Sequence, residues 1–349
     1  MSAIASLRHR LFGGVGNSLL TIVMLILFAI ALPPILRWLL IDASWGGATP
    51  ADCRAAGGAC WAVIHEKYRL ILFGRYPYAE QWRPLLAMAA SIGLVLATCD
   101  RRLGWRRLSF LWIVGVAFVA LMMWGGALGL TYVETARWGG LPLTLILSLT
   151  GIAVAFPLAI LLALGRRSTM PLISSLCVGV IELVRGVPLV SMLFMASFLI
   201  PLFLPGGVQL NELLRAQAAI AVFSAAYLAE AIRGGLQAVP EGQSSAAQSL
   251  GLGYWQTVGL VVLPQALRVS IPAIVNIFIG LFKDTSLVGI VGLMDLLLSA
   301  KQALGDPAWR TFSLETYLFV AAIYFCFCFF MSRYSQALER QGLRRENKA

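Results

Sequence analysis

The chain has 349 residues, of which 59% are hydrophobic and only 12% are charged, and its formal net charge at pH 7 is +11. About a quarter of the residues of a typical soluble domain are charged, so this composition excludes an ordinary soluble protein and, with repeated apolar runs of about twenty residues, predicts an integral membrane protein. The Arg and Lys residues lie mainly in short clusters between the apolar runs, where they orient membrane proteins, so we expect a lipid environment and no nucleic-acid partner.

Eight apolar runs are predicted to cross the membrane as helices. The first is longer than the apolar core of a cleaved signal peptide, so we interpret it as a retained span that follows a cytoplasmic N-terminus. Basic clusters at 101–107 and 166–167 mark the cytoplasmic side, and eight spans place both termini there. The predicted spans cover about residues 18–41, 84–98 (extendable to 103), 108–130, 141–164, 171–205 (an approach segment and the fifth span, with a break at Pro188), 216–232, 267–291 and 317–331.

A polar loop at residues 42–83 separates the first two runs and contains Cys53 and Cys60. These cysteines can form a disulfide if the loop faces an oxidising compartment and remain thiols if it does not, and both alternatives stay open. The loop itself could contact a partner or cap the outer face. The other four cysteines lie in or beside apolar runs and are predicted to be small core residues.

No catalytic or metal centre is predicted. The only histidines, His9 and His65, and the scattered cysteines form no metal-binding pattern. The chain also lacks the glycine-rich Walker loop that holds nucleotide phosphates, so any ATP must bind to another protein.

Two pairs of opposite charges lie at the inner ends of predicted spans. Glu182 and Arg185, at the start of the fifth span, are three residues apart, and Glu230 and Arg233, at the end of the sixth, repeat this spacing. Each pair can neutralise itself on one helix face. The pairs could fix the ends of core helices, or they could form a cytoplasmic gate.

Segment 237–264 is a long polar interruption between the last apolar runs. Pro240 and Gly242 break the preceding helix, and a short helix is then predicted to carry Ala246, Ala247 and Leu250 on one face. Gly251 and Gly253 end it. A face of small residues permits close approach to a partner, although an ordinary connector helix is the alternative.

The spacing Ala246-Ala247-x3-Gly251-x9-Val261-x-Leu263-Pro264 resembles the EAA signature of ABC-importer permeases, E-A-A-x3-G-x9-I-x-L-P. Ser245 stands where that signature has Glu, which puts any ion pair of this Glu in doubt. Other segments resemble the polar amino-acid uptake family of these permeases, the histidine and glutamine permease type, and within it the general L-amino-acid permeases. They are RGVPL at 185–189, YLAEAIRGG at 227–235 and KDTSL at 283–287.

The resemblance implies an all-α membrane protein with a type I ABC-importer permease core at residues 140–335. It also implies an N-terminal region at 1–139, with three spans and a periplasmic loop 42–83, and a basic cytoplasmic tail at 336–349. Segment 237–264 is expected to hold a coupling helix that docks on an ATPase. The residues expected to couple to the ATPase are Ser245, Ala246, Ala247, Leu250, Gly251 and Gly253.

The resemblance further implies a non-catalytic permease subunit of the bacterial inner membrane that imports polar L-amino acids. Expected partners are a second, paralogous permease in a heterodimer, a periplasmic amino-acid-binding protein, and a dimer of ATP-binding subunits that holds ATP and Mg. This chain is expected to bind no cofactor. An ion-coupled secondary transporter, supported only by the buried charges, and a membrane scaffold are the alternatives.

An amino acid carries an ammonium and a carboxylate, so a buried transport site must satisfy both charges. Lys283 and Asp284 interrupt the apolar run 271–293 and point to different helix sides, with two hydroxyl groups beside them. We predict a role in the substrate pathway for this segment, and an outer gate or a subunit contact is the alternative. The predicted pathway residues are Lys283, Asp284, Thr285 and Ser286, with Arg185 as a further carboxylate partner.

Overall fold

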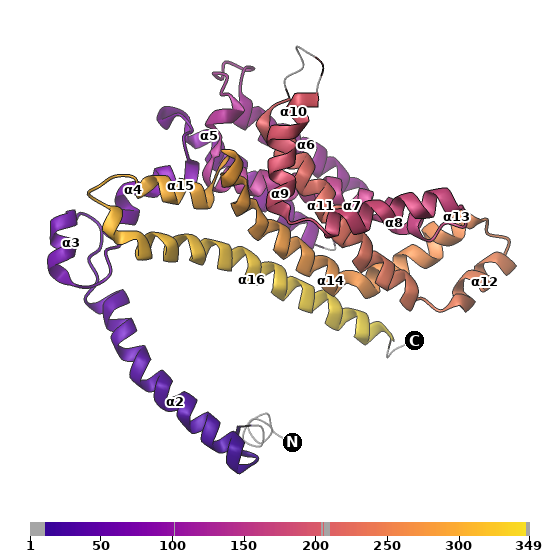
Figure 1. The fold of residues 1–349 in the computed structure, drawn as a ribbon, viewed down its shortest axis with the longest axis horizontal. Coiled ribbons are helices and arrows are strands. Elements are labelled where there is room, and N and C mark those ends of the chain that lie inside the picture. Colours follow the sequence, from indigo (N-terminus) through magenta and orange to yellow (C-terminus); the bar gives the residue numbers. More distant parts are fainter. Residues whose placement is uncertain (1–10, 101, 204, 206–209, 347–349) are drawn as a thin grey trace. The chain divides into compact units, whose positions relative to one another are not determined.

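The computed structural model describes residues 11–100, 102–203, 205 and 210–346, and these residues are almost entirely helical (Figure 1). The first half contains α2 (Val15–Leu36), η1 (Arg37–Ile41), α3 (Pro50–Ala56), α4 (Ala62–Phe73), η2 (Tyr78–Glu80), α5 (Trp82–Cys99), α6 (Trp105–Trp124), η3 (Thr135–Arg137) and α7 (Gly140–Arg166). Then follow α8 (Pro171–Arg185), α9 (Leu189–Phe194), η4 (Met195–Leu199), α10 (Ile200–Phe203), α11 (Glu212–Ala238) and α12 (Glu241–Ser249). The last elements are α13 (Tyr254–Gln256), η5 (Thr257–Val262), α14 (Leu263–Asp284), η6 (Thr285–Val291), β1 (Met294–Asp295), α15 (Leu296–Ala303), η7 (Arg310–Phe312) and α16 (Ser313–Glu346).

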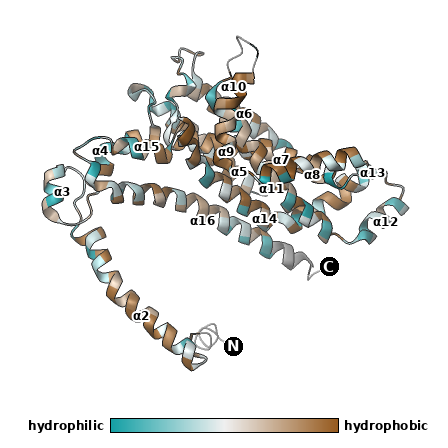
Figure 2. Cartoon of the chain, viewed as in Figure 1, coloured by the Kyte–Doolittle hydropathy of each residue, from teal (hydrophilic) through white to brown (hydrophobic). Residues whose placement is uncertain are grey.

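Seven helical segments among the described residues are long and apolar enough to cross a membrane. An eighth span results if the bent pair Pro171–Arg185 and Leu189–Phe203 counts as one, with an angle of 103° between its halves. The predicted all-α membrane fold is therefore confirmed, and the predicted break at Pro188 lies at this bend. Figure 2 shows that α2 is mostly hydrophobic, whereas α12 carries hydrophilic residues.

Several helices extend beyond the apolar runs that predicted them. The sixth span was expected at 216–232, but α11 begins after Asn211, whose side chain accepts a hydrogen bond from the Leu213 amide at 2.8 Å, and it continues to Ala238. A helix continues through polar residues until a cap or a breaker stops it, and hydropathy alone does not record this. The seventh span likewise begins early, at Tyr254, and its π-helical stretch Thr257–Val262 directly precedes α14 and its Pro264.

The chain forms two compact units. The smaller unit consists of the residues up to Tyr68 together with Leu304–Phe319, and the larger unit consists of Arg69–Ala303 together with the residues from Val320 on. The predicted boundary between residues 139 and 140 lies inside the larger unit.

The smaller unit has a core around a disulfide. Cys53 and Cys60 are bonded, with their Cα atoms 5.4 Å apart, and both are buried with Trp309 and Phe312. Glu315 Oε1 accepts a hydrogen bond from the Cys60 amide at 3.0 Å. Contacts therefore join residues of the 42–83 loop to residues about 250 positions later.

The core of the larger unit lies where α7, α11 and α14 pack together (Figure 1). Its interface consists largely of alanines, which let helix backbones approach closely. At Gly235, a β-carbon would lie 2.0 Å from Ser270 Oγ and 2.3 Å from the Ala266 carbonyl oxygen of α14, so no larger residue fits here without a shift. The fully buried alanines of the interface are Ala155, Ala159, Ala163, Ala225, Ala229 and Ala266.

The first turn of α7 is attached to the start of α15. Gly139 and Gly140 pair with Met294 and Asp295 of β1 in parallel. The Asp295 carboxylate is fully buried and accepts hydrogen bonds from the amides of residues 297 and 298 at 2.9 and 3.1 Å. Asp295 therefore caps α15.

We expect the Cys53–Cys60 disulfide to be detectable by thiol counting. Under denaturing conditions a maleimide should label four thiols in the unreduced chain, which are the four free cysteines, and six after reduction. The double variant Cys53→Ser/Cys60→Ser should show no difference on reduction, and its smaller unit should lose about 2 kcal/mol of stability because the unfolded chain is less constrained. Six labelled thiols in the unreduced wild-type chain would contradict the assignment.

The second prediction concerns the pH dependence of stability at Asp295. Burial raises the pKa of this carboxyl group to about 6, although amide hydrogen bonds partly offset the effect. The folded state therefore holds the proton more tightly than the unfolded state, and this contribution to stability is lost as the pH rises from about 4 to about 6. Asp295→Asn keeps a capping oxygen without a charge, so its advantage over wild type should grow across this window to roughly 3 kcal/mol.

Thermal unfolding of the detergent-solubilised protein at pH 4.5 and pH 7.5 measures this difference. Asp295→Ala is the control, because it removes the cap and should be destabilised relative to Asp295→Asn at both pH values. A difference between wild type and Asp295→Asn that does not change with pH would show that Asp295 ionises normally.

Candidate functional site

The α12 segment ends in a hydrogen-bonded glycine turn. Gly251 has φ = +82°, its amide donates to the Gln248 carbonyl oxygen at 2.9 Å, and the Leu252 amide donates to the Ala247 carbonyl oxygen at 3.2 Å. These two bonds form a Schellman motif, which requires a left-handed residue after the helix. The glycine at this position of the predicted coupling helix therefore has a backbone role. Gly253, with φ = −69°, is instead the N-cap of α13.

Ala246, Ala247 and Leu250 were expected to share one face of α12, but in the structure they point to different sides. Ala247 is only 4% exposed and faces the chain's own interior, whereas Leu250 is 84% exposed and Ala246 is also exposed. The prediction of one common face is wrong for Ala247, because adjacent helical residues point about 100° apart. The outward face is formed by Ala246 and Leu250, four residues apart, and Ser245 is exposed beside it.

A side-chain hydrogen bond connects α12 to the start of α14. Gln265 Nε2 donates to Gln243 Oε1 at 3.2 Å and to the Val261 carbonyl oxygen at 2.9 Å. The sequence analysis did not identify this pair, because nothing in the local pattern shows that residues 22 positions apart meet.

The two predicted charge pairs belong to one cluster with Arg166, the last residue of α7. Arg166 Nη1 lies 2.5 Å from Glu230 Oε1 and 3.1 Å from Glu182 Oε1. Arg233 Nη2 lies 2.9 Å from Glu230 Oε2, as the three-residue spacing predicts. Arg185 Nη1 lies 3.8 Å from Glu182 and 3.7 Å from Glu230. Glu182 and Arg185 therefore do pair as their spacing predicts, but Arg166, which the sequence did not place in the cluster, is the closer partner of Glu182.

Arg166 was interpreted from the sequence only as a marker of the cytoplasmic side. Its role in the cluster depends on the packing of α7 against α8 and α11, which the sequence pattern does not specify. The arginine in the predicted pathway set, Arg185, also lies in this cluster, with its guanidinium 5.7 Å from the ring centroid of Tyr227.

The Lys283–Ser286 segment lies at the junction of α14 and η6. Lys283 is exposed, Asp284 is half-buried, and the two form no ion pair within 4.0 Å among the described residues. Thr285 is fully buried, and its hydroxyl donates to the Phe282 carbonyl oxygen at 2.7 Å. The hydroxyl of Thr285 is thus engaged within the chain, which leaves Lys283, Asp284 and Ser286 as the accessible polar groups.

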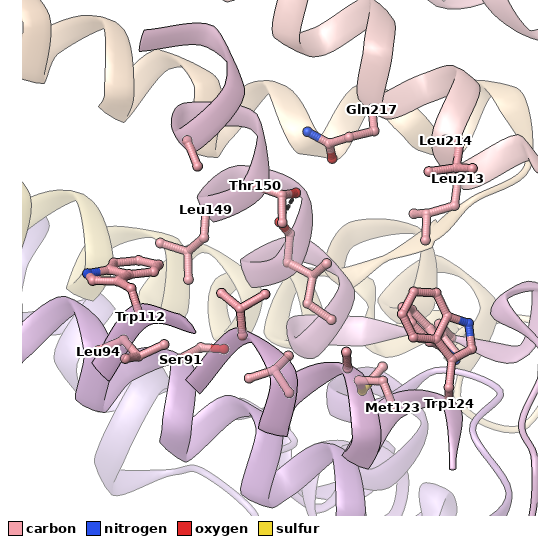
Figure 3. Close-up of a pocket in the computed structure, with 16 residues that line it drawn as sticks. Ser91, Leu94, Trp112, Met123, Trp124, Leu149, Thr150, Leu213, Leu214 and Gln217 are labelled. Carbon is pink, nitrogen blue, oxygen red and sulfur yellow. Dashed lines mark hydrogen bonds between the residues drawn. The ribbon is translucent and has the colours of Figure 1, made fainter. Parts of the chain in front are cut away.

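An apolar cavity of about 290 Å³ lies between α5, α6, α7 and α11 (Figure 3). Its polar lining residues are few, and the hydroxyls of Ser91 and Thr150 donate to carbonyl oxygens of their own helices at 2.8 and 2.6 Å. Gln217 adds an amide whose buried nitrogen has no hydrogen-bond partner among the described residues. None of the described residues that line the cavity is charged, so these residues cannot satisfy both charges of an amino acid. The cavity is therefore not a site for such a zwitterion.

Among the residues that the structure describes, no group of three or more His, Cys, Asp or Glu side chains could hold a metal ion. His9, one of the two histidines, lies outside these residues.

The glycine turn of α12 leads to a local prediction. Gly251→Ala places a β-carbon at φ = +82°, which costs about 1 kcal/mol, so hydrogen exchange of the Leu252 amide should become about fivefold faster. Gly253→Ala is the matched control, because the φ of −69° at Gly253 suits any L-residue. In this variant the exchange rate of the Leu252 amide should stay near that of wild type. Equal exchange rates in both variants would show that the turn does not depend on Gly251.

Comparison with known proteins identifies the family. Residues 155–341 match the family described as "Binding-protein-dependent transport system inner membrane component". The chain is 49% identical over 341 residues to the inner membrane amino-acid ABC transporter permease protein YhdY of Escherichia coli (strain K12), covering 97% of this chain and 93% of that protein. It is 39% identical over 416 residues to the glutamate/glutamine/aspartate/asparagine transport system permease protein BztC of Rhodobacter capsulatus, covering 100% and 95%.

A solved structure described as an amino acid ABC transporter with histidines is similar, with a TM-score of 0.51 and 31% identity. The similarity covers 58% of this chain and 92% of that chain. The family match covers more than half of the chain, and the 49% identity to a permease extends over almost its full length. Together with the similar helical core, these findings show that the chain belongs to the family of inner-membrane components of binding-protein-dependent transport systems.

Proposed function

We propose that this chain is the permease subunit of an ATP-driven importer of polar L-amino acids, either of broad range or of the glutamate, glutamine, aspartate and asparagine type. The observation that carries the proposal is the 49% identity, over almost the full length of the chain, to the amino-acid permease YhdY. The similarity to BztC supports the polar substrate class. Hydrolysis of ATP belongs to a partner subunit, which holds the nucleotide and Mg, because this chain contains no Walker loop.

The geometry of α12 supports the coupling role. A nine-residue helix, Glu241–Ser249, follows a long buried helix and presents an almost fully exposed leucine. A large apolar side chain at such a position loses its contact with water only when a partner covers it. The partner in this proposal is the ATPase dimer, which docks on Ala246, Leu250 and the adjoining Ser245.

The number of spans supports the orientation. With the bent pair counted as one span, eight crossings place the N- and C-termini on the same side of the membrane, and the basic clusters favour the cytoplasm. The α12 segment then faces the ATPase, and the disulfide-containing loop faces the oxidising periplasm. That loop is our candidate contact for a periplasmic amino-acid-binding protein, and a paralogous permease would complete a heterodimer.

The substrate pathway is proposed to include the segment at the junction of α14 and η6. Lys283 and Asp284 offer one charge of each sign at neighbouring positions, as an ammonium and a carboxylate require. Ser286 adds a hydroxyl. Arg185 is a second candidate for the carboxylate, and its membership in the inner charge cluster also suits a gate.

The proposal predicts that a charge at Leu250 uncouples the transporter. In proteoliposomes that contain the permeases, the ATPase and the binding protein, Leu250→Asp should lower ATP-dependent uptake of a radiolabelled amino acid mixture by at least about tenfold, because a carboxylate would be buried in the docking surface. The amount of chain inserted in the membrane should not change, since Leu250 is 84% exposed.

The control is Gln248→Ala, an exposed polar residue of the same helix. It should retain uptake within about twofold of wild type, as surface substitutions usually do. Uptake that continues without ATP under an ion gradient would overturn the proposal in favour of a secondary transporter. Undiminished uptake by Leu250→Asp would remove α12 from the coupling surface.

A further inference from the structure

We propose that Arg166 is the positioning residue that transmits movement of the coupling segment to the bend between α8 and α9, with Arg167 holding the neighbouring turn. The inference rests on the proposed function, since it describes how a force applied at α12 reaches the spans.

A single guanidinium group joins three helices. Arg166 is the last residue of α7, and its Nη1 contacts Glu230 of α11 at 2.5 Å and Glu182 of α8 at 3.1 Å. The Arg166 side chain is 22% exposed and that of Glu230 is 17% exposed. An ion pair that is mostly shielded from water is screened less than a surface pair, so it resists separation more strongly.

The next residue holds the turn from which the coupling segment departs. Arg167 Nη1 donates to the carbonyl oxygen of Leu236 at 3.1 Å, in the final turn of α11. Only two residues, Val239 and Pro240, separate the end of α11 at Ala238 from the start of α12. A displacement of α12 therefore acts first on the final turn of α11, which is hydrogen-bonded to Arg167 at the end of α7.

The other end of the connection is the bend in the fifth span. Glu182 and Arg185 lie in the last turn of α8, and the chain then bends by 103° before α9 begins at Leu189. A movement of α11 passes from Glu230 through Arg166 to Glu182, at the edge of this bend. The bend is also where a proline interrupts the helical hydrogen bonding, so it is a point at which the span can change direction.

The charge balance makes Glu230 the central carboxylate. It lies within 4.0 Å of three guanidinium groups, whereas Glu182, the other carboxylate of the cluster, is 53% exposed. Separation of α11 from α7 would move the Glu230 carboxylate away from Arg166. The guanidinium groups of Arg166 and Arg185 would then lie near each other without it, which is costly for partly buried charges. The helices are therefore expected to move together as one unit at their inner ends.

The test measures how much ATP is hydrolysed per amino acid transported, in the reconstituted complete transporter. Arg166→Gln should raise this ratio by roughly tenfold, because the ATPases still cycle but α8 follows α11 less closely, with only the longer Arg185–Glu230 contact of 3.7 Å left between their charges. Arg166→Lys keeps the charge but not the forked geometry and should restore the ratio only in part. A merely structural role would lower the amount of assembled transporter without changing the ratio.

Two matched variants test whether the effect of Arg166→Gln comes from the lost connection between helices or merely from the loss of a positive charge. Arg233→Gln removes a guanidinium group from the same cluster. Among the described residues, Arg233 forms an ion pair within 4.0 Å only with Glu230 of its own helix, so its effect should be clearly smaller than that of Arg166→Gln. Arg268→Gln removes an exposed arginine of α14 that forms no ion pair with any described residue, and it should leave the ratio unchanged.

A ratio in Arg166→Gln equal to that of wild type, or equal to that of Arg233→Gln, would overturn the inference. If Arg166→Gln fails to assemble, Glu182→Gln replaces it, because this exposed carboxylate connects α8 to Arg166 and its loss should also raise the ratio. An unchanged ratio in Glu182→Gln would likewise overturn the inference. Absence of ATP-driven uptake in the wild-type transporter would instead refute the proposed function itself.

Discussion

The close approach of α7, α11 and α14 is the constraint on which the larger unit depends. Lipid tails are as apolar as leucine side chains, so helices in a membrane associate through tight packing rather than through the exclusion of water. Small residues make that packing possible here, and Gly235 brings α11 within reach of the Ala266 carbonyl oxygen of α14. At this close approach the Ser270 hydroxyl of α14 lies 3.0 Å from the Ala231 carbonyl oxygen of α11.

The two ends of α7 show how this packing is used. At its first turn, Gly139 and Gly140 pair with β1, where the buried carboxylate of Asp295 caps α15. At its last residue, Arg166 joins the carboxylates of α8 and α11. A helix of 27 residues is about 40 Å long, so one continuous helix connects the paired turn at its first residues to the charge cluster at its last residue.

The α12 segment, our proposed coupling segment, contrasts with this core. Its helix is held by one inward alanine, a glycine turn and a hydrogen bond between Gln243 and Gln265. The remaining surface, with Leu250 outermost, is free for another protein. A segment with few contacts that continues from a tightly packed helix can move when a partner acts on it. In our inference, Arg166 transmits that movement to the spans.

The sequence by itself determined the class of the protein, the approximate spans, the break at Pro188 and the short polar helix with its glycine turn. These features depend on local properties: the length of apolar runs, the loss of a hydrogen bond at proline and the glycine that a left-handed turn requires. The prediction for Arg233 and Glu230 held for the same reason, because three residues along one helix are always neighbours. The exact ends of helices were not accessible, since caps rather than hydropathy set them.

Only the tertiary structure decided which helices meet. The sequence pattern placed Ala247 on the docking face, but packing of the segment turned it inward. It paired Glu182 with Arg185, whereas the contact of α7 with α8 and α11 made Arg166 the nearer partner. Periodicity describes the faces of a single helix and contains no information about the neighbour that each face will contact. For that physical reason the part of Arg166 in the charge cluster was visible only once the helices were packed together.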